Sequence, residues 1–277
     1  MASTHSTVFI LGISSDIGRE LAERYLRDGF SVFGTYRQKK HVEKKFFDKV
    51  TLFPCEVRNV KSVAKVVSLC KKAGLGWDIF ISAVGTEEPI GAFFSCAYDE
   101  WEESVIINSI APLRMLHDLY PLRSPHKINH AVFFAGGGTN NPVTNYSAYC
   151  VSKIFLIKMC ELLDDENPDL NVFIVGPGVV RTKIHLETIQ SGNRAGKNYQ
   201  RVKEFLASKS GGTPQNDIYA SINWCIQQGR AIVGGRNLSV VHDEWRQGGE
   251  KLAQTLREDP NMFKLRRHGN TAGVTQL

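Results

Sequence analysis

The sequence lacks the features that mark membrane, secreted and disulfide-stabilised proteins. No apolar run approaches the roughly 20 residues that a membrane-spanning helix needs. The N-terminus has neither the basic nor the apolar region of a secretory signal. The six cysteines are scattered without a Cys-x-x-Cys pair. These absences predict a soluble protein without membrane association, in a reducing cytoplasm.

Signals for nucleic acid and for metal are also missing. The formal net charge of +6 could attract a polyanion, but no recognition motif accompanies it. The densest basic runs, Arg37–Lys45 and Lys264–His268, are of the kind that usually forms solvated surface. His185 and His242 are far apart and have no Cys or carboxylate partner at ligand spacing. We expect neither a nucleic-acid partner nor a metal site.

What the sequence does contain is a regular alternation of strand-like and helix-like segments. Of the 277 residues 42% are hydrophobic, and many lie in short apolar runs typical of strands buried on both faces. Helical periods such as Ile17, Leu21 and Tyr25 separate these runs. The alternation predicts a single α/β domain, a doubly wound parallel sheet of about seven strands with helices on both faces. The predicted strands are Thr7–Gly12, Phe30–Tyr36, Val50–Phe53, Asp78–Ala83, His130–Ala135, Leu170–Gly176 and Ala231–Val241.

A glycine turn follows the first predicted strand. The residues Gly12-Ile13-Ser14-Ser15-Asp16-Ile17-Gly18 end that strand and open the first helical segment. Glycine permits a tight turn and a close backbone approach, and a helix N-terminus offers unpaired N–H groups to a phosphate. Two glycines at this spacing are about as typical of a plain strand-to-helix turn as of a phosphate-binding turn. The turn alone therefore leaves both interpretations open.

The turn resembles the Thr-Gly-x-x-x-Gly-Ile-Gly motif of the short-chain dehydrogenase/reductase family. Leu11 replaces the threonine and Asp16 the middle glycine, while the flanking glycines are kept. Asp16 could cap the helix, but it also brings negative charge close to a bound phosphate. The resemblance implies a Rossmann-like fold and a dinucleotide site that includes Gly12, Ser14, Ser15, Ile17 and Gly18.

Arg37 indicates which dinucleotide is bound. It follows the second predicted strand about 20 residues after the turn, where an NAD site usually has an acidic residue for the ribose 2′-hydroxyl. Its guanidinium group suits a 2′-phosphate instead, and Lys39 and Lys40 add positive charge nearby. We expect NADP(H) as the cofactor in preference to NAD(H). The alternative is a surface arginine and a site that does not discriminate.

Further motifs of the family follow in chain order. Cys55-Glu56-Val57 stands where the family has Asp-Val beside the adenine, and Ser82-Ala83-Val84-Gly85 where it has Asn-Asn-Ala-Gly. Pro177 to Thr182 matches the Pro-Gly-x-Val-x-Thr motif, which in the family contacts the nicotinamide end. The resemblance therefore adds these cofactor-binding residues: Glu56, Val57, Ser82, Ala83, Gly85, Pro177, Gly178, Val180 and Thr182.

Tyr149 and Lys153 form a Tyr-x-x-x-Lys pair. On a helix, this spacing places both side chains on one face. A phenol is a poor acid or base at neutral pH, and a nearby ammonium group stabilises the phenolate. The family resemblance implies that Tyr149 exchanges a proton with the substrate oxygen. It also implies that Lys153 lowers the pKa of Tyr149 and binds the nicotinamide ribose, so that both residues belong to the catalytic site and to the cofactor site.

The other two members of the family's catalytic set are less clear. Asn108 resembles the asparagine of a proton relay, although a helical asparagine can also be purely structural. The catalytic serine is expected some thirteen residues before Tyr149, where the sequence reads Ala135-Gly136-Gly137-Gly138. No serine is there. Thr139, Asn140 or backbone N–H groups of the glycine run could supply the hydrogen bond that the serine would give.

The resemblance favours one function over two others. It implies an NADP(H)-dependent oxidoreductase that interconverts a carbonyl and an alcohol on a small molecule, with a nucleotide sugar among the candidates. A nucleotide-sugar epimerase or dehydratase usually has a larger C-terminal domain than this chain offers. The missing serine favours the third alternative, a dinucleotide-binding sensor or scaffold of little activity.

Two segments depart from the alternation of strands and helices. The polar segment 183–213 is expected to be a loop that closes over the substrate. Residues 246–277 are expected to be a polar tail, which leaves residues 1–245 as the dinucleotide-binding domain. The family also suggests a homodimer or homotetramer built on the helix that carries Tyr149.

Overall fold

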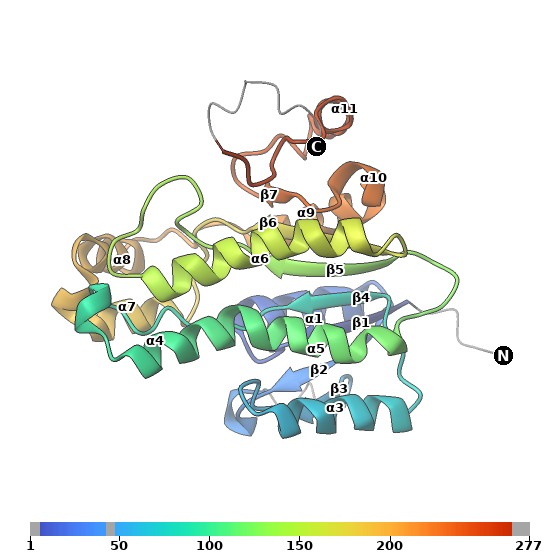
Figure 1. Ribbon diagram of the computed structural model, residues 1–277, viewed down its shortest axis with the longest axis horizontal. Helices are drawn as coiled ribbons and strands as arrows, with labels where there is room; N and C mark the ends of the chain where they lie inside the picture. Colours follow the sequence, from blue (N-terminus) through green and yellow to red (C-terminus); the bar gives the residue numbers. More distant parts are fainter. Residues whose placement is uncertain (1–5, 43–47, 268–277) are drawn as a thin grey trace, which may run out of the picture.

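The computed structural model describes residues 6–42 and 48–267. Within them, seven parallel strands form one sheet in the order β3-β2-β1-β4-β5-β6-β7 (Figure 1). The predicted α/β fold with helices on both faces of a parallel sheet is confirmed. The strands are β1 (Thr7–Leu11), β2 (Ser31–Tyr36), β3 (Thr51–Pro54), β4 (Ile79–Ser82), β5 (Asn129–Phe134), β6 (Leu170–Gly176) and β7 (Asn237–Ser239).

The strands contribute side chains to two separate cores, one on each face of the sheet. In β1, Val8 and Ile10 belong to the first core, whereas Phe9 and Leu11 belong to the second. All four are fully buried. Successive residues of a strand point to opposite faces, so a strand covered on both sides must be apolar throughout. This is why the sequence shows continuous apolar runs in place of alternating ones.

Helices cover both faces of the sheet. The helices α3, α5 and α6 pack on one face, which is turned to the viewer in Figure 1, and α1 and α9 pack on the other. Side-chain caps begin two of them: Ser15 accepts from Gly18 N at the start of α1, and Asn59 accepts from Lys61 N at the start of α3. The helices named here are α1 (Asp16–Arg27), α3 (Val60–Lys72), α5 (Ala111–Leu119), α6 (Ser147–Glu166) and α9 (Gln215–Gln228).

Short helical elements complete the described chain. The π-helical turn η3 joins α4 to α5 without a break. The remaining elements are η1 (Lys39–His41), η2 (Phe93–Ser95), α4 (Tyr98–Val105), η3 (Ile106–Ile110), η4 (Tyr120–Leu122), α7 (His185–Ser191), η5 (Gly192–Ala195), α8 (Lys197–Ala207), α10 (Arg230–Val233) and α11 (Gly249–Glu258). No helix among residues 6–42 and 48–267 is long and apolar enough to span a membrane.

Two sequence expectations were wrong about local structure. The run Ala231–Val241 is not one strand: its first residues form helix α10, and only Asn237–Ser239 pairs with β6. The residues Ile232 and Val233 bury their side chains from this helix as they would from a strand, and a short apolar run does not distinguish the two. The segment 183–213 is mostly helical, because it contains α7, η5 and α8.

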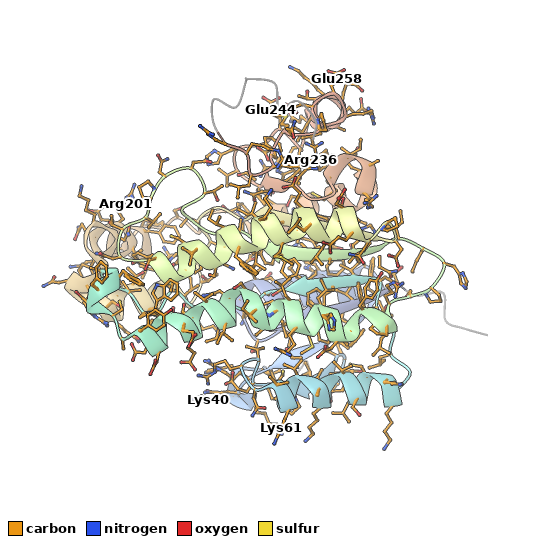
Figure 2. The ribbon with its side chains drawn as sticks, in the orientation of Figure 1. Lys40, Lys61, Arg201, Arg236, Glu244 and Glu258 are labelled. Carbon is orange, nitrogen blue, oxygen red and sulfur yellow. The ribbon has the colours of Figure 1, made fainter. Side chains whose placement is uncertain are left out.

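Residues after Trp245 were expected to form a polar tail, but they include a helix packed on the core. In α11, Leu252, Ala253 and Leu256 are buried in the core that also contains α1 and α9. The buried guanidinium group of Arg236, next to β7, donates to the carbonyl oxygens of Leu256 (2.6 Å) and Asp259 (3.0 Å). Figure 2 labels Arg236 and, near the end of α11, Glu258. The C-terminal helix is thus part of the same folded unit.

Candidate active site

A large pocket lies at the carboxyl ends of the strands. Its volume is about 1750 Å³, and it extends from the β1–α1 turn to α7 and α8. The strand order reverses between β1 and β4, and residues that follow both strands line the pocket. Such a switch point leaves a crevice between two strand ends, the usual ligand site of open α/β sheets. The topology therefore places the pocket where a dinucleotide binds in this class of fold.

The β1–α1 turn has the close packing that the two glycines predict. Gly12 has a φ of +82°, and a Cβ atom on it would lie 2.6 Å from Cγ1 of Val84. A Cβ atom on Gly18 would lie 2.5 Å from the Gly12 carbonyl oxygen. Neither position accepts a side chain without displacement of its neighbours. The turn therefore keeps the N-terminus of α1 at the pocket wall, where its N–H groups fit a diphosphate.

Asp16 serves a different purpose from the helix cap considered in the sequence analysis. The cap of α1 is Ser15, whose hydroxyl oxygen accepts from Gly18 N at 3.0 Å. Asp16 Oδ2 instead accepts from the backbone N–H of Lys183 at 2.6 Å, and Lys183 Nζ lies 3.7 Å from Asp16 Oδ1. The carboxylate thus joins the β1–α1 turn to the segment after β6. The lysine charge offsets the negative charge that the departure from the family motif brings to this turn.

Positive charge collects at the pocket end beside β2. Arg37, His41 and Lys183 all line the pocket. The pKa of His41 is lowered by desolvation and then by the charges of Lys183, Lys40 and Arg37. Like charges that gather around one space create a positive potential that favours an anion.

Glu56 adds little negative charge to this end. Arg58 Nε lies 3.0 Å from Glu56 Oε1, and this hydrogen bond is the main cause that lowers the pKa of the Glu56 carboxyl group. The carboxylate is therefore ionised and paired. An anionic ligand near Arg37 therefore meets a carboxylate that is paired with Arg58, which also binds Glu103, and not a free carboxylate.

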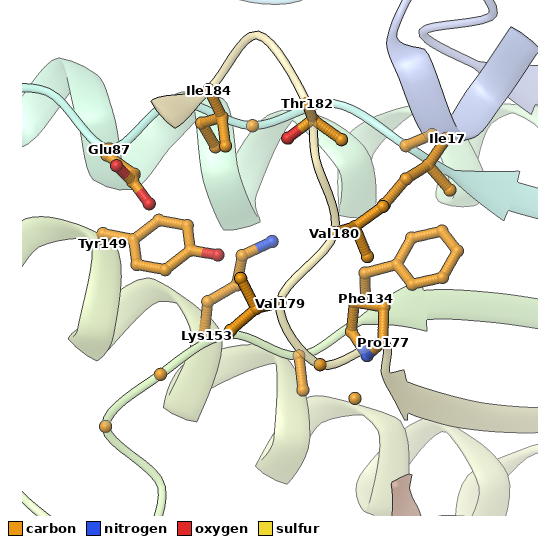
Figure 3. Close-up of a pocket in the computed structure, with 18 of the residues that line it drawn as sticks. Ile17, Glu87, Phe134, Tyr149, Lys153, Pro177, Val179, Val180, Thr182 and Ile184 are labelled. Carbon is orange, nitrogen blue, oxygen red and sulfur yellow. The ribbon is translucent and has the colours of Figure 1, made fainter. Parts of the chain in front are cut away.

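Tyr149 and Lys153 meet in the middle of the pocket. Both project from α6, and Figure 3 shows the ammonium group of Lys153 beside the phenol of Tyr149. Lys153 Nζ lies 5.5 Å from the centre of the Tyr149 ring. Thr182 and Val180 extend into the same space from the segment after β6 (Figure 3). The structure thus brings the predicted catalytic pair and the predicted nicotinamide segment together.

The pKa of the Tyr149 phenol is shifted in the direction opposite to the sequence expectation. Burial raises this pKa, and the charge of Glu87 raises it further. Burial also lowers the pKa of Lys153 to about 8. Desolvation disfavours the charged form of each group. The net shift keeps the Tyr149 phenol protonated at neutral pH, and the expectation that Lys153 lowers the pKa of Tyr149 stays a prediction.

Gly136 occupies the position of the missing serine. It precedes Tyr149 by thirteen residues, and a Cβ atom on it would lie 2.5 Å from the Tyr149 hydroxyl oxygen and 2.6 Å from Cε1. The tyrosine ring fills the space that a side chain at position 136 would need. Gly136, Gly137, Gly138, Thr139 and Asn140 all line the pocket.

Asn108 lies behind the pocket wall and is tied to the β4–α4 segment. Its Nδ2 donates to the carbonyl oxygens of Thr86 and Ser104, both at 2.9 Å, and its Oδ1 accepts from Thr86 N at 3.0 Å. A Cβ atom on Gly85 would lie 3.2 Å from Asn108 Oδ1 and 4.0 Å from Lys153 Nζ. Asn108 also sits in the π-helical turn η3, a feature frequent at functional sites. Both interpretations of this residue, structural support and a relay close to Lys153, agree with its position.

Most of the predicted site residues line one pocket. Three do not: Gly18 lies under the β1–α1 turn, Ser82 is buried in β4, and Asn108 lies behind Gly85. The predicted residues that do line the pocket are Gly12, Ser14, Ser15, Ile17, Arg37, Glu56, Val57, Ala83, Gly85, Tyr149, Lys153, Pro177, Gly178, Val180 and Thr182.

Sequence reasoning missed the acidic residues of the pocket. Glu87 and Glu187 both line it near Tyr149, although one follows β4 and the other belongs to α7. The sequence signal for Glu87 was its place just after a buried strand and Gly85. Nothing in the sequence pairs it with Glu187. The described residues contain no group of three or more His, Cys, Asp or Glu side chains that could hold a metal ion.

Comparison with known proteins shows which family and fold the chain resembles. A family model described as short chain dehydrogenase matches residues 6–191. The human protein "Dehydrogenase/reductase SDR family member 2, mitochondrial" is 23% identical over 240 residues, which is 84% of each chain. The NADPH-dependent pterin aldehyde reductase of Arabidopsis thaliana is 23% identical over 185 residues, 64% of this chain and 76% of its own. A Shigella flexneri short-chain dehydrogenase solved with NADP has the same fold, with a TM-score of 0.70 at 18% identity over 85% of this chain and 96% of its own.

Proposed function

The chain belongs to the short-chain dehydrogenase/reductase family, and we propose that it is an NADP(H)-dependent enzyme that reduces a carbonyl group of a small molecule to an alcohol. The observation that carries the proposal is the meeting of Tyr149, Lys153 and Thr182 in one pocket whose far end is lined by the β1–α1 turn and Arg37. A proton donor, a ribose-binding ammonium group and a phosphate-binding turn are what such a reaction requires of the protein.

The residues of the pocket fit an NADP(H) molecule along its length. A bound nicotinamide dinucleotide supplies the hydride. The N-terminus of α1 would bind its diphosphate, Arg37 its 2′-phosphate, and Thr182 its carboxamide. Lys153 is buried beside Tyr149, where its ammonium group would donate to the nicotinamide ribose. The NADPH in the name of the Arabidopsis reductase and the NADP in the Shigella structure support the same cofactor.

The protonation state of Tyr149 favours reduction over oxidation. A phenol whose pKa is raised by burial carries its proton at neutral pH and can give it to the carbonyl oxygen as hydride arrives at carbon. The reverse reaction needs the phenolate and is disfavoured until the pH is high. Reduction at neutral pH is therefore the direction that this site supports.

Binding of NADPH and NADH tests the cofactor. We expect NADPH to bind more tightly than NADH, and Arg37→Ala to weaken NADPH binding by about tenfold with little change for NADH, because a 2′-phosphate contact is lost. Nicotinamide fluorescence measures both affinities without a substrate. Equal affinities in the parent protein, or an Arg37→Ala variant that binds NADPH unchanged, would contradict the role of Arg37. Turnover is then sought with carbonyl compounds, nucleotide sugars among them, as NADPH oxidation.

The outer face of α6 supports a proposal about assembly. Val151, Phe155 and Leu162 lie at helical spacing on this helix and are 45%, 40% and 43% exposed, next to Ile110 at 38%. An apolar stripe on an unpartnered helix face is typical of a subunit interface. We propose a homodimer through this face. Light scattering after gel filtration should show a dimer for the parent protein and a folded monomer for Phe155→Glu, with the exposed Leu69→Glu of α3 as a control that stays dimeric.

The cysteines support a reducing compartment such as the cytosol. All six are unpaired, and Cys55, Cys70, Cys160 and Cys225 are buried. Buried thiols with raised pKa values react slowly and need no disulfide partner.

A further inference from the structure

Glu87 lies beside the catalytic tyrosine, and none of the family motifs assigns it a role. It comes two residues after Gly85 and lines the pocket together with Tyr149. Figure 3 shows its carboxyl group directed towards the Tyr149 ring, on the side away from Pro177. Of the charged groups that act on the Tyr149 phenol, Glu87 has the largest effect on its pKa. Glu87 thus lines the pocket beside the ring of the proposed proton donor.

A chain of hydrogen bonds fixes the orientation of the Glu87 carboxyl group. The Thr188 hydroxyl donates to Glu87 Oε2 at 2.8 Å, and the Tyr146 hydroxyl lies 2.8 Å from the same threonine oxygen. Thr188 has one hydroxyl proton, which goes to Glu87, so Tyr146 must donate to Thr188. The hydrogen-bond chain from Tyr146 through Thr188 therefore ends at Oε2. The other oxygen, Oε1, makes no hydrogen bond with any residue that the structure describes.

The surroundings of Glu87 favour its neutral form. Glu187 from α7 lies next to it, and Glu187 Oε2 accepts from Glu87 N at 2.6 Å and from the Thr86 hydroxyl at 3.0 Å. In the described part of the chain, neither carboxylate has a Lys, Arg or His partner. Burial and the charge of Glu187 raise the pKa of Glu87 to about 7. The other titratable groups that face Glu87 are Tyr146, Tyr149 and Cys150, which bring no positive charge.

We propose that protonated Glu87 gives the substrate carbonyl oxygen the hydrogen bond that the family's serine would otherwise supply. Gly136 leaves no side chain at the serine position, and the Tyr149 ring fills that space. With Oε2 held by Thr188, Oε1 is the oxygen that would carry the proton, in a carboxyl group that Figure 3 shows beside the Tyr149 ring. This role rests on the proposed reduction of a carbonyl compound.

In the proposed step, Glu87 stabilises charge but does not lose its proton. Hydride adds to the carbonyl carbon, the π electrons of the C=O bond move to oxygen, and the Tyr149 phenol transfers its proton to that oxygen. The products are the alcohol, the oxidised dinucleotide and a Tyr149 phenolate that regains a proton from water. During the transfer, the Glu87 O–H bonds to the developing negative oxygen. Such a preorganised donor acts most strongly where charge appears in the transition state.

The pH dependence of kcat tests the role of Glu87. With benzaldehyde and diacetyl as carbonyl probes, reduction by the parent protein should decline as the pH rises through about 7, because Glu87 loses its proton. Glu87→Gln keeps an N–H donor at every pH, so its decline should begin only near pH 8, where Lys153 is deprotonated. Glu87→Leu has no donor and should be slower than the parent by about 10²-fold below pH 7. This difference should narrow as the pH rises through about 7, because the parent then loses the Glu87 proton as well.

Controls separate this role from folding and from cofactor binding. Glu88→Gln changes the exposed neighbour of Glu87 and should keep the parent pH profile. NADPH should bind equally well to all variants, because Glu87 lies away from the cofactor end. Infrared difference spectra between acid and neutral pH should show a protonated carboxyl band in the parent protein that Glu87→Gln removes.

Each outcome decides something different. If Glu87→Leu reduces both probes as fast as the parent with the same pH profile, Glu87 is not the donor. If Thr139→Ala instead causes the 10²-fold loss in rate, the loop after the glycine run supplies the hydrogen bond to the substrate oxygen, and Glu87 does not. If the parent protein binds NADPH but reduces no carbonyl compound, the proposed function fails, and the role of Glu87 fails with it.

Discussion

Tyr149→Phe should lower kcat for carbonyl reduction by about 10³-fold and leave NADPH binding unchanged. The variant keeps the ring that packs against Gly136 and removes only the hydroxyl group that donates the proton. Proton transfer by a positioned side chain contributes about 10² to 10⁴-fold to rate. Initial rates of NADPH oxidation and a fluorescence titration with NADPH, made on the same preparation, measure the two quantities.

Tyr98→Phe is the matched control for that variant. Tyr98 lies on α4, is 62% exposed and does not line the pocket, so loss of its hydroxyl group should not change the rate. Parent-like turnover by Tyr149→Phe would mean that another group donates the proton. It would also remove the central residue of the proposed mechanism. Loss of both turnover and NADPH binding would indicate a disturbed pocket, and a melting curve identifies that case.

Gly136→Ser should reduce activity, although it restores the residue that the family has at this position. A serine Cβ atom would lie 2.5 Å from the Tyr149 hydroxyl oxygen and 2.7 Å from Cζ, so the ring must move. Overpacking of this kind typically costs about 1–3 kcal/mol, and displacement of a catalytic group by about 1 Å can cost about 10²-fold in rate. We expect kcat to fall by about that factor and the melting temperature to decrease.

Gly137→Ser provides the comparison for this variant. A Cβ atom on Gly137 would meet only Cγ2 of Val143, at 3.4 Å, which is close to an ordinary contact. The neighbouring substitution should therefore leave kcat and stability near the parent values. A Gly136→Ser variant faster than the parent would show that the ring has room to move and that the serine works in its usual place. The need for Glu87 as a donor would then disappear.

The family and the sheet could be predicted from the sequence, and so could the placement of Tyr149 and Lys153 on one helix, because each depends on residues close together in the chain. A strand buried on both faces must be apolar throughout, so Val8 to Leu11 is recognisable as a strand. The geometry of one turn sets the positions of Gly12 and Gly18. The geometry of one helix sets those of Tyr149 and Lys153. The order of these motifs along the chain then limits the fold.

Helix α11 lies in a segment that average polarity predicted to be a tail outside the core. The segment after Trp245 is polar on average, yet Leu252 and Leu256 lie at helical spacing, and both are buried in the core. The spacing was visible in the sequence. The contact that anchors the helix was not visible in the sequence. Arg236 lies just before β7 and donates to the carbonyl oxygen of Leu256 in α11, 20 residues later in the chain.

By itself, the sequence determined the class of fold, the glycine turn after β1 and the placement of Tyr149 and Lys153 on one helix, since backbone geometry within a few residues fixes them. Only the tertiary structure decided what surrounds these groups. It placed Lys183 on Asp16 across 167 residues and Glu187 on Thr86 across 101 residues. It also filled the serine position with the Tyr149 ring and buried the phenol, which raises the Tyr149 pKa. Charge, burial and free space depend on residues distant in the chain, and folding alone brings these together.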